Sequence, residues 1–289
     1  MLDKDDDMTE PSKTDNATVV HLPLLPTGKP HISFSELAVW LDCPFRHKLA
    51  YIDKLGTFEG NEHTFFGTHV HSGCETFIKT GVVHIDEVLA SIDNTWDSRG
   101  FLDKDVWMLA ASSILTELPS WLDNTFEDWK PIDAEHVIYE PLTHIGHPDV
   151  KWKGMIDAVI SHRGPRGKDI VRIMDWKTTS WGWARDKQRD FKVNAQAAAY
   201  KIFWSTKFDI PLKDIRANFV LLKRSAKDGA RCQSIEVSVG PSMVKQVNTS
   251  IDKMLRAVKA SYAPKNKLSC KYCEFNATEH CEGVGNRLK

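Results

Sequence analysis

The pattern of hydrophobic and polar positions changes near residue 135. Before that point, apolar residues recur at helical spacing. Ser33 or Ser35 can cap a helix that continues to Cys43–Pro44 and resumes over residues 45–52. Further helices are predicted over residues 68–79 and within residues 86–130, where most of the tryptophans belong to the hydrophobic core.

After residue 135 the spacing favours strands. The predicted order is three strands, a helix, two strands and a last helix: 137–139, 150–160, 170–176, 191–204, 217–223, 232–239 and 241–262. Residues 162–168 have the composition of a hairpin connection. This order predicts an α/β (α+β) fold with a helical N-terminal part. The predicted divisions are a disordered acidic tail and linker, a helical part, a core and a cysteine-containing C-terminal segment: 1–30, 31–130, 131–262 and 263–289.

The composition is that of an ordinary globular protein, with 42% hydrophobic and 27% charged residues. No apolar run is long enough to cross a bilayer, so no membrane partner is expected. The N-terminal segment is acidic and lacks the order of a signal peptide. We therefore expect a cytoplasmic location. Because this compartment is reducing, disulfides are not the first interpretation of the six cysteines.

The charge is distributed unevenly along the chain. Residues 201–289 carry 17 Lys or Arg but only 8 Asp or Glu, although the net charge of the whole chain is −1. Such a basic segment suits a phosphate backbone, because binding releases condensed counterions. A solvated basic face without a ligand explains the same composition equally well.

Two carboxylates and a lysine lie at the ends of neighbouring predicted strands. Asp175 and Lys177 are two residues apart and so share a face of one strand, and Asp157 lies in the strand before it. Carboxylates hold a hard divalent cation, and a lysine beside them can place its charge next to an attacking water or a phosphate. Taken alone, Asp175 and Lys177 are more often an exposed salt bridge at the end of a strand.

Other polar residues could complete this site. His71, or its competitor His69, opens a predicted helix and could add an imidazole ligand. Gln196 and Tyr200 are four residues apart, which stacks them on one face of a helix. Glu75 and Glu140 could position metal or water, or could be plain surface carboxylates.

The C-terminal cysteines form a second group. Cys270 and Cys273 are separated by two residues, and Cys281 follows shortly after them. Such thiols can bind a soft metal, with Cys43 or His280 as a fourth ligand. Cys74 and Cys232 have no such partners and are interpreted as core or surface thiols.

These pieces together resemble the RecB-like branch of the PD-(D/E)XK nuclease superfamily. The similar segments are ISFSELAVWLDCPFRHKLAYI, FGTHVH, GMIDAVI, IMDWKTT and QAAAY, and the similarity spans about residues 31–281. One departure is Ile156, which stands where the superfamily has its eponymous proline. The resemblance implies a restriction-endonuclease-like core with a mixed central sheet.

The resemblance also implies roles for the candidate residues. His71, Asp157 and Asp175 would bind Mg²⁺ or Mn²⁺, with the carbonyl of Trp176 as a further ligand. Lys177 would orient or activate the water. Gln196 and Tyr200 would line the edge of the site and contact the nucleic acid.

Iron–sulfur members of that branch carry one cysteine before the core and three after it. Cys43, Cys270, Cys273 and Cys281 resemble this layout, which implies a structural 4Fe–4S cluster, with Zn²⁺ as the alternative. The chain is thus similar to the CRISPR-type or phage-type exonucleases of the branch.

The resulting hypothesis is a metal-dependent DNA nuclease. We expect an exonuclease that acts on single-stranded DNA or DNA ends in recombination, replication or phage DNA metabolism of a bacterial, archaeal or phage-infected cell. A recombinase, a helicase or a CRISPR-adaptation protein is the implied partner. The alternatives are a structure-specific endonuclease for flaps or overhangs and a catalytically silent DNA-binding scaffold.

Aromatic and basic residues follow the proposed lysine. Trp181 and Trp183 could stack on bases or pack in the core, whereas Trp176 is predicted to point into the core, away from Asp175 and Lys177.

Overall fold

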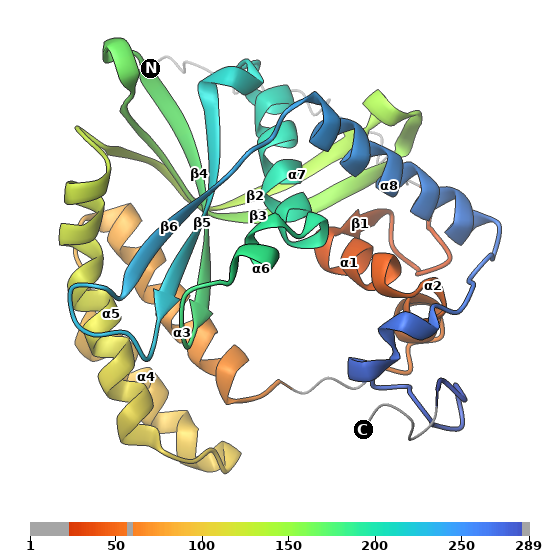
Figure 1. The fold of residues 1–289 in the computed structure, drawn as a ribbon, viewed down its shortest axis with the longest axis horizontal. Helices are drawn as coiled ribbons and strands as arrows, with labels where there is room; N and C mark the ends of the chain where they lie inside the picture. The colour runs from red at the N-terminus through yellow and green to blue at the C-terminus, as the bar shows by residue number, and fades with distance from the viewer. Residues whose placement is uncertain (1–22, 57–59, 285–289) are drawn as a thin grey trace, which may run out of the picture.

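A six-stranded mixed sheet forms the centre of the molecule (Figure 1). The computed structural model describes residues 23–56 and 60–284. The strands are β1 (His31–Ser33), β2 (Lys130–Leu142), β3 (His147–Arg163), β4 (Asp169–Thr179), β5 (Ile215–Lys223) and β6 (Cys232–Val237). β1 runs parallel to β3 and β4 runs parallel to β5, while the other neighbours are antiparallel. The predicted α/β class with a mixed central sheet is confirmed.

Helices cover both faces of this sheet (Figure 1). One face carries α3 (Glu62–Thr80), α4 (Ile85–Trp96) and α5 (Lys104–Thr125), and the other carries α1 (Phe34–Asp42), α7 (Phe191–Phe208) and α8 (Pro241–Lys259). The short helix α2 (Pro44–His47) follows α1, and the short helix α6 (Arg185–Arg189) lies between β4 and α7. Each face therefore has its own hydrophobic core, and the sheet lies between the two.

The two cores take alternate residues of the central strands. Met174 and Trp176 of β4 pack beneath α3 and α5, whereas Ile173 packs beneath α7 and α8. Trp176 is only 1% exposed, which confirms that it points into the core. Within residues 23–56 and 60–284, no helix is long and apolar enough to cross a membrane.

Several boundaries differ from the sequence predictions. The helix expected to begin at residue 68 begins at Glu62, because Asn61 and Thr64 form a reciprocal capping box. The region expected to be helical over residues 86–130 is interrupted between α4 and α5, where Gly100 adopts a positive φ of 69°. β1 was not predicted. Most of the predicted tail, residues 1–22, lies outside the described residues, but Leu25 in the predicted linker is buried.

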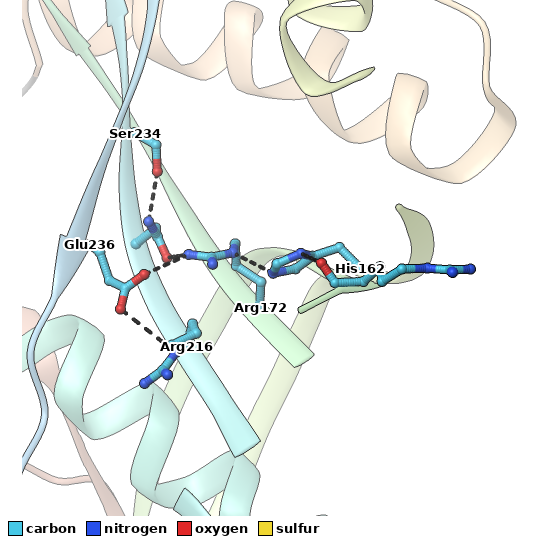
Figure 2. Close-up of polar contacts among 7 residues, drawn as sticks. His162, Arg172, Arg216, Ser234 and Glu236 are labelled. Atoms are coloured by element: carbon cyan, nitrogen blue, oxygen red, sulfur yellow. Dashed lines mark hydrogen bonds and ion pairs between the residues drawn. The ribbon is translucent and has the colours of Figure 1, made fainter. Parts of the chain in front are cut away.

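A buried polar network joins β3, β4, β5 and β6 (Figure 2). Arg172 of β4 donates to Nε2 of His162 at 3.1 Å, to Oε2 of Glu236 at 3.2 Å and to Asn218. Asn218 in turn donates to Oγ of Ser234 at 2.6 Å. The guanidinium group of Arg172 also lies 4.8 Å from the ring of Phe126. The network therefore satisfies an arginine that is 8% exposed.

Candidate active site

The candidate site lies where one edge of β3 loses its strand partners. β4 pairs with Ala158–Arg163 of this edge, and β1 pairs with Lys151–Lys153 of the same strand. Residues 154–157 fall between these two partners, so the edge is open there. Polar side chains can therefore enter between β3 and β4, in the gap that contains Asp157.

Asp157 connects the two diverging strands. Its Oδ2 accepts a hydrogen bond of 2.7 Å from the backbone N–H of Trp176 on β4. The same carboxylate lies 3.9 Å from Nδ1 of His71, which comes from α3. The structure thus brings Asp157 and His71, two of the residues singled out from the sequence, close to each other.

The second half of the site is a chain of polar contacts from β4 to α7. Nζ of Lys177 lies 2.6 Å from Oδ2 of Asp175 and donates to Oε1 of Gln196 at 3.0 Å. Nε2 of Gln196 donates to the hydroxyl of Tyr200 at 3.1 Å. The spacing of two on the strand and of four on the helix therefore places these four side chains in one line.

Burial controls the protonation of this site. Burial, followed by the charge of Asp175, raises the pKa of Asp157 to about 8, and burial also raises the pKa of Asp175. Burial and the nearby Lys177 lower the pKa of His71 to about 4, so its imidazole is neutral at pH 7. A buried carboxylate, a partly buried carboxylate and a neutral imidazole form a site that a cation would stabilise.

The donor set fits a divalent cation. Within the described residues, Nε2 of His71 is buried without a hydrogen-bond partner, and the buried Oδ2 of Asp175 has the ammonium group of Lys177 2.6 Å away. Carboxylate and imidazole are ordinary ligands of such ions. The side chains are not yet arranged as a binding site. Among the residues that the structure describes, no group of three or more His, Cys, Asp or Glu side chains is positioned to hold a metal ion.

The remaining candidates from the sequence make other contacts. His69 hydrogen-bonds to Ser91 at 3.1 Å instead of reaching the carboxylates. Glu140 forms an ion pair with Lys207 at 3.4 Å, and Glu75 forms one with Lys79. Trp181 is 64% exposed, whereas the ring of Trp183 packs 5.1 Å from that of Phe219.

One acidic neighbour of the site was missed by the sequence analysis. Glu135 lies in β2 between the residues that pair with Ala158 and Ile156, so it stands across from Asp157. Its backbone has a positive φ of 52°, and its negative charge contributes to the raised pKa of Asp157. No turn residue marks this irregularity in the sequence, so only the structure reveals it.

The four cysteines at the two ends of the described chain border one cavity. Cys43, Cys270, Cys273 and Cys281 all line it, and none of them forms a disulfide. Several contacts hold the ends together. Among them, the backbone N–H of Asn266 donates to Sγ of Cys43 at 3.2 Å, and Arg46 pairs with Glu274 at 2.7 Å. His280, the alternative ligand, does not line this cavity. Cys74 and Cys232 are buried in the core, as one of their two interpretations predicted.

Comparison with known proteins assigns this chain to a family. The model of the PD-(D/E)XK nuclease superfamily matches residues 31–278. A crystal structure from Eubacterium rectale, of a protein provisionally designated an exonuclease, superposes with a TM-score of 0.52 at 12% identity and covers 91% of this chain and 92% of that chain. A crystal structure of SSO0001 covers 86% of this chain and 84% of its own at 14% identity, with a TM-score of 0.39. No curated protein matches the chain at a significant level.

Proposed function

The chain belongs to the PD-(D/E)XK nuclease superfamily, and from this membership we propose that it is a metal-dependent DNA nuclease of the RecB-like branch. Nuclease activity follows from the family, whose members use divalent metals such as Mg²⁺. The observation that carries the finer proposal is the contact of Lys177 with both Asp175 and Gln196, beside Asp157 and His71.

The proposed roles come from the family resemblance, and these contacts support them. His71, Asp157 and Asp175 would hold Mg²⁺ or Mn²⁺, with the carbonyl of Trp176 as a further ligand. The bound cation would supply Lewis-acid polarisation of the phosphate and acidification of a water. Lys177 would orient that water and stabilise the developing negative charge, and Gln196 would fix the position of its ammonium group.

Two cavities beside the site suggest a path for a nucleic-acid strand. One, of about 380 Å³, is lined by Lys177, Lys187 and Lys192 among others. The second, of about 520 Å³, is lined by Lys29 and Lys153 and extends to Tyr200. Gln196 lines both cavities, so they meet beside the residue that contacts the proposed catalytic lysine. Lysines on both sides suit a phosphodiester backbone.

We further propose that the enzyme is an exonuclease acting on single-stranded DNA or on DNA ends. The resemblance to RecB-like exonucleases supports this, and exonuclease is also the provisional designation of the Eubacterium rectale neighbour. Recombination, replication or phage DNA metabolism in a bacterial, archaeal or phage-infected cytoplasm would be the setting. A recombinase, a helicase or a CRISPR-adaptation protein would be the partner.

The cleavage assay uses end-labelled single- and double-stranded DNA with Mg²⁺ or Mn²⁺. Asp175→Asn keeps the volume of the side chain but removes its charge, and it should reduce cleavage at least about 10²-fold. Asp149→Asn is the matched control, because this exposed aspartate lies on β3 outside the site and should leave the rate unchanged. Undiminished cleavage by Asp175→Asn would show that the site is wrong.

Circular single-stranded DNA separates the proposed function from its rivals. An exonuclease needs an end and leaves the circle intact, whereas a flap or overhang endonuclease using the same residues opens circles or cuts internal junctions. A catalytically silent scaffold binds DNA but releases no product with either metal. Intact circles together with degraded linear strands support the exonuclease.

We also propose a 4Fe–4S cluster at Cys43, Cys270, Cys273 and Cys281. Its support is that four reduced thiols line one cavity and that a backbone N–H donates to one of the sulfurs, as is common around such clusters. The cluster would staple the two ends of the chain. A brown anaerobic preparation with four iron atoms per chain is expected. A colourless preparation containing zinc would favour the alternative metal.

A further inference from the structure

A large cavity lies away from the candidate active site, between α7, the start of β5 and the start of α8. Its volume is about 700 Å³, and none of its lining residues lines either cavity beside the catalytic lysine. Arg216, on its wall, is five residues before Leu221, which pairs with Lys177. At about 3.3 Å per residue along β5, Arg216 therefore lies roughly 16 Å from the position that pairs with Lys177.

The side chains around this cavity are positive. Lys201, Lys213, Arg216 and Lys245 line it together with apolar residues such as Val239 and Val244, and no aspartate or glutamate is among its lining residues. The first turn of α8, at Gly240 and Pro241, also lines the cavity. The N-terminus of a helix carries a partial positive charge, and no side chain caps this one.

Lys201 is the unusual member of this group. It is 4% exposed in the middle of α7, yet its ammonium group forms no ion pair and no hydrogen bond within residues 23–56 and 60–284. Burial and the nearby Arg216 lower the pKa of Lys201, while Glu236 opposes them. Glu236 itself is shared by Arg172 and Arg216, and Asp214 beside the cavity pairs with Lys168.

A largely buried lysine side chain without an anion partner is held at a cost, because the surrounding protein solvates its charge less well than water does. An anion in the cavity would offset this cost through charge-assisted hydrogen bonds to Lys201 and Arg216. The free end of α8 would add to the attraction. We propose that this cavity is a binding site for a phosphate group, separate from the catalytic centre. The phosphate would come from a free nucleotide or from the backbone of a polynucleotide.

Isothermal titration calorimetry in EDTA tests this proposal with two probes. One is a deoxynucleoside monophosphate, and the other is a short oligonucleotide without terminal phosphates. Saturable binding of either probe is expected. A response to the monophosphate identifies a free nucleotide as the source, and a response to the oligonucleotide alone identifies the backbone.

Variants locate that binding. Lys201→Met keeps the length of the side chain without its charge and should weaken binding at least about tenfold. The exposed Lys245→Ser should also weaken binding, and it tests the site even if Lys201→Met misfolds. The exposed Lys253→Ser on the same helix should bind normally, and Lys177→Met reports whether a probe occupies the catalytic site instead.

No saturable binding by the wild-type protein, or binding that survives both Lys201→Met and Lys245→Ser, would overturn the proposal. Loss of binding in Lys177→Met with retention in Lys201→Met would also do so, because the probe would then occupy the catalytic site. None of these results depends on whether the protein cleaves DNA.

Discussion

The backbone N–H of Trp176 donates a hydrogen bond of 2.7 Å to Oδ2 of Asp157, where β3 and β4 cease to pair. A carboxylate thus takes the place of a strand carbonyl at this point. The bond fixes the position of Asp157 relative to β4, and therefore relative to Asp175. The separation of the strands creates the gap, and this bond keeps its two sides in register.

Removal of metal should make stability depend on pH through Asp157. Its pKa is about 8 in the folded state, well above that of an unfolded aspartate, so the folded protein binds the extra proton. Stability is therefore lost as pH rises towards 8. Between pH 6.5 and 8 in EDTA, the free energy of unfolding in urea should fall by up to about 2 kcal/mol.

The pH range is chosen to exclude the neighbouring imidazole. The pKa of His71 is lowered to about 4, so this group increases stability as pH rises to 6.5 and contributes little above it. Asp157→Asn should abolish the fall, and Mg²⁺ should reduce it in the wild-type protein. An unchanged slope in Asp157→Asn would assign the effect to another group.

Substitution of Gly154 should disturb the catalytic lysine from a distance. A Cβ at this position would lie 2.9 Å from Cε1 of Tyr200, closer than such contacts allow. Tyr200 would have to move, and with it Gln196, which contacts Lys177. Gly154→Ala should lower the cleavage rate about tenfold and destabilise the fold by about 1–3 kcal/mol.

Gly56→Ala provides a control for this substitution, because the added Cβ would meet only ordinary contacts of 3.6 Å or more. Cleavage kinetics and urea unfolding measured together separate the two effects. A wild-type rate in Gly154→Ala would mean that Tyr200 does not position Gln196 and Lys177.

The sequence predicted the strands that carry the site because their apolar runs are long and regular. It placed Asp175 and Lys177 on one face from their spacing alone. It did not predict the open edge of β3, because β1 consists of only His31–Ser33 and has too few residues for a periodic pattern. The left-handed residue Glu135 was missed for a related reason, since ordinary strand residues surround it.

Long-range packing was also beyond the sequence pattern. Lys201 follows a run of small and apolar residues on α7, and a lysine is ordinarily exposed. Its burial results from the arrangement of α7 beside β5 and α8, which no local spacing encodes. The convergence of Cys43 with Cys270 was expected only from the resemblance to a family, because more than two hundred residues separate them.

Loss of Arg172 should destabilise the protein without affecting catalysis. Arg172→Met would leave His162 and Asn218 without their buried donor (Figure 2). The free energy of unfolding should fall by about 2–4 kcal/mol, as measured in urea. Cleavage per folded molecule should be unchanged, because the network does not contact the catalytic side chains.

Arg163→Met is the matched control for that measurement. Arg163 is about half exposed and pairs with Asp128 on the surface, so its loss should cost no more than about 1 kcal/mol. Equal losses in the two variants would show that the buried network contributes nothing beyond a surface ion pair.

The buried contact between Glu36 and His47 should stabilise the segment that carries Cys43. Nε2 of His47 lies 3.0 Å from Oε1 of Glu36, and both side chains are at most 2% exposed. Glu36→Ala removes the carboxylate of this contact and leaves the imidazole buried, so it should cost about 3–5 kcal/mol in urea unfolding. Glu36→Gln retains an oxygen acceptor and should cost clearly less.

Ser35→Ala, at an exposed neighbour outside the contact, should be nearly neutral, because Ser33 and not Ser35 caps α1. Equal losses in Glu36→Ala and Glu36→Gln would mean that the charge of Glu36, rather than its hydrogen bond, stabilises the pair.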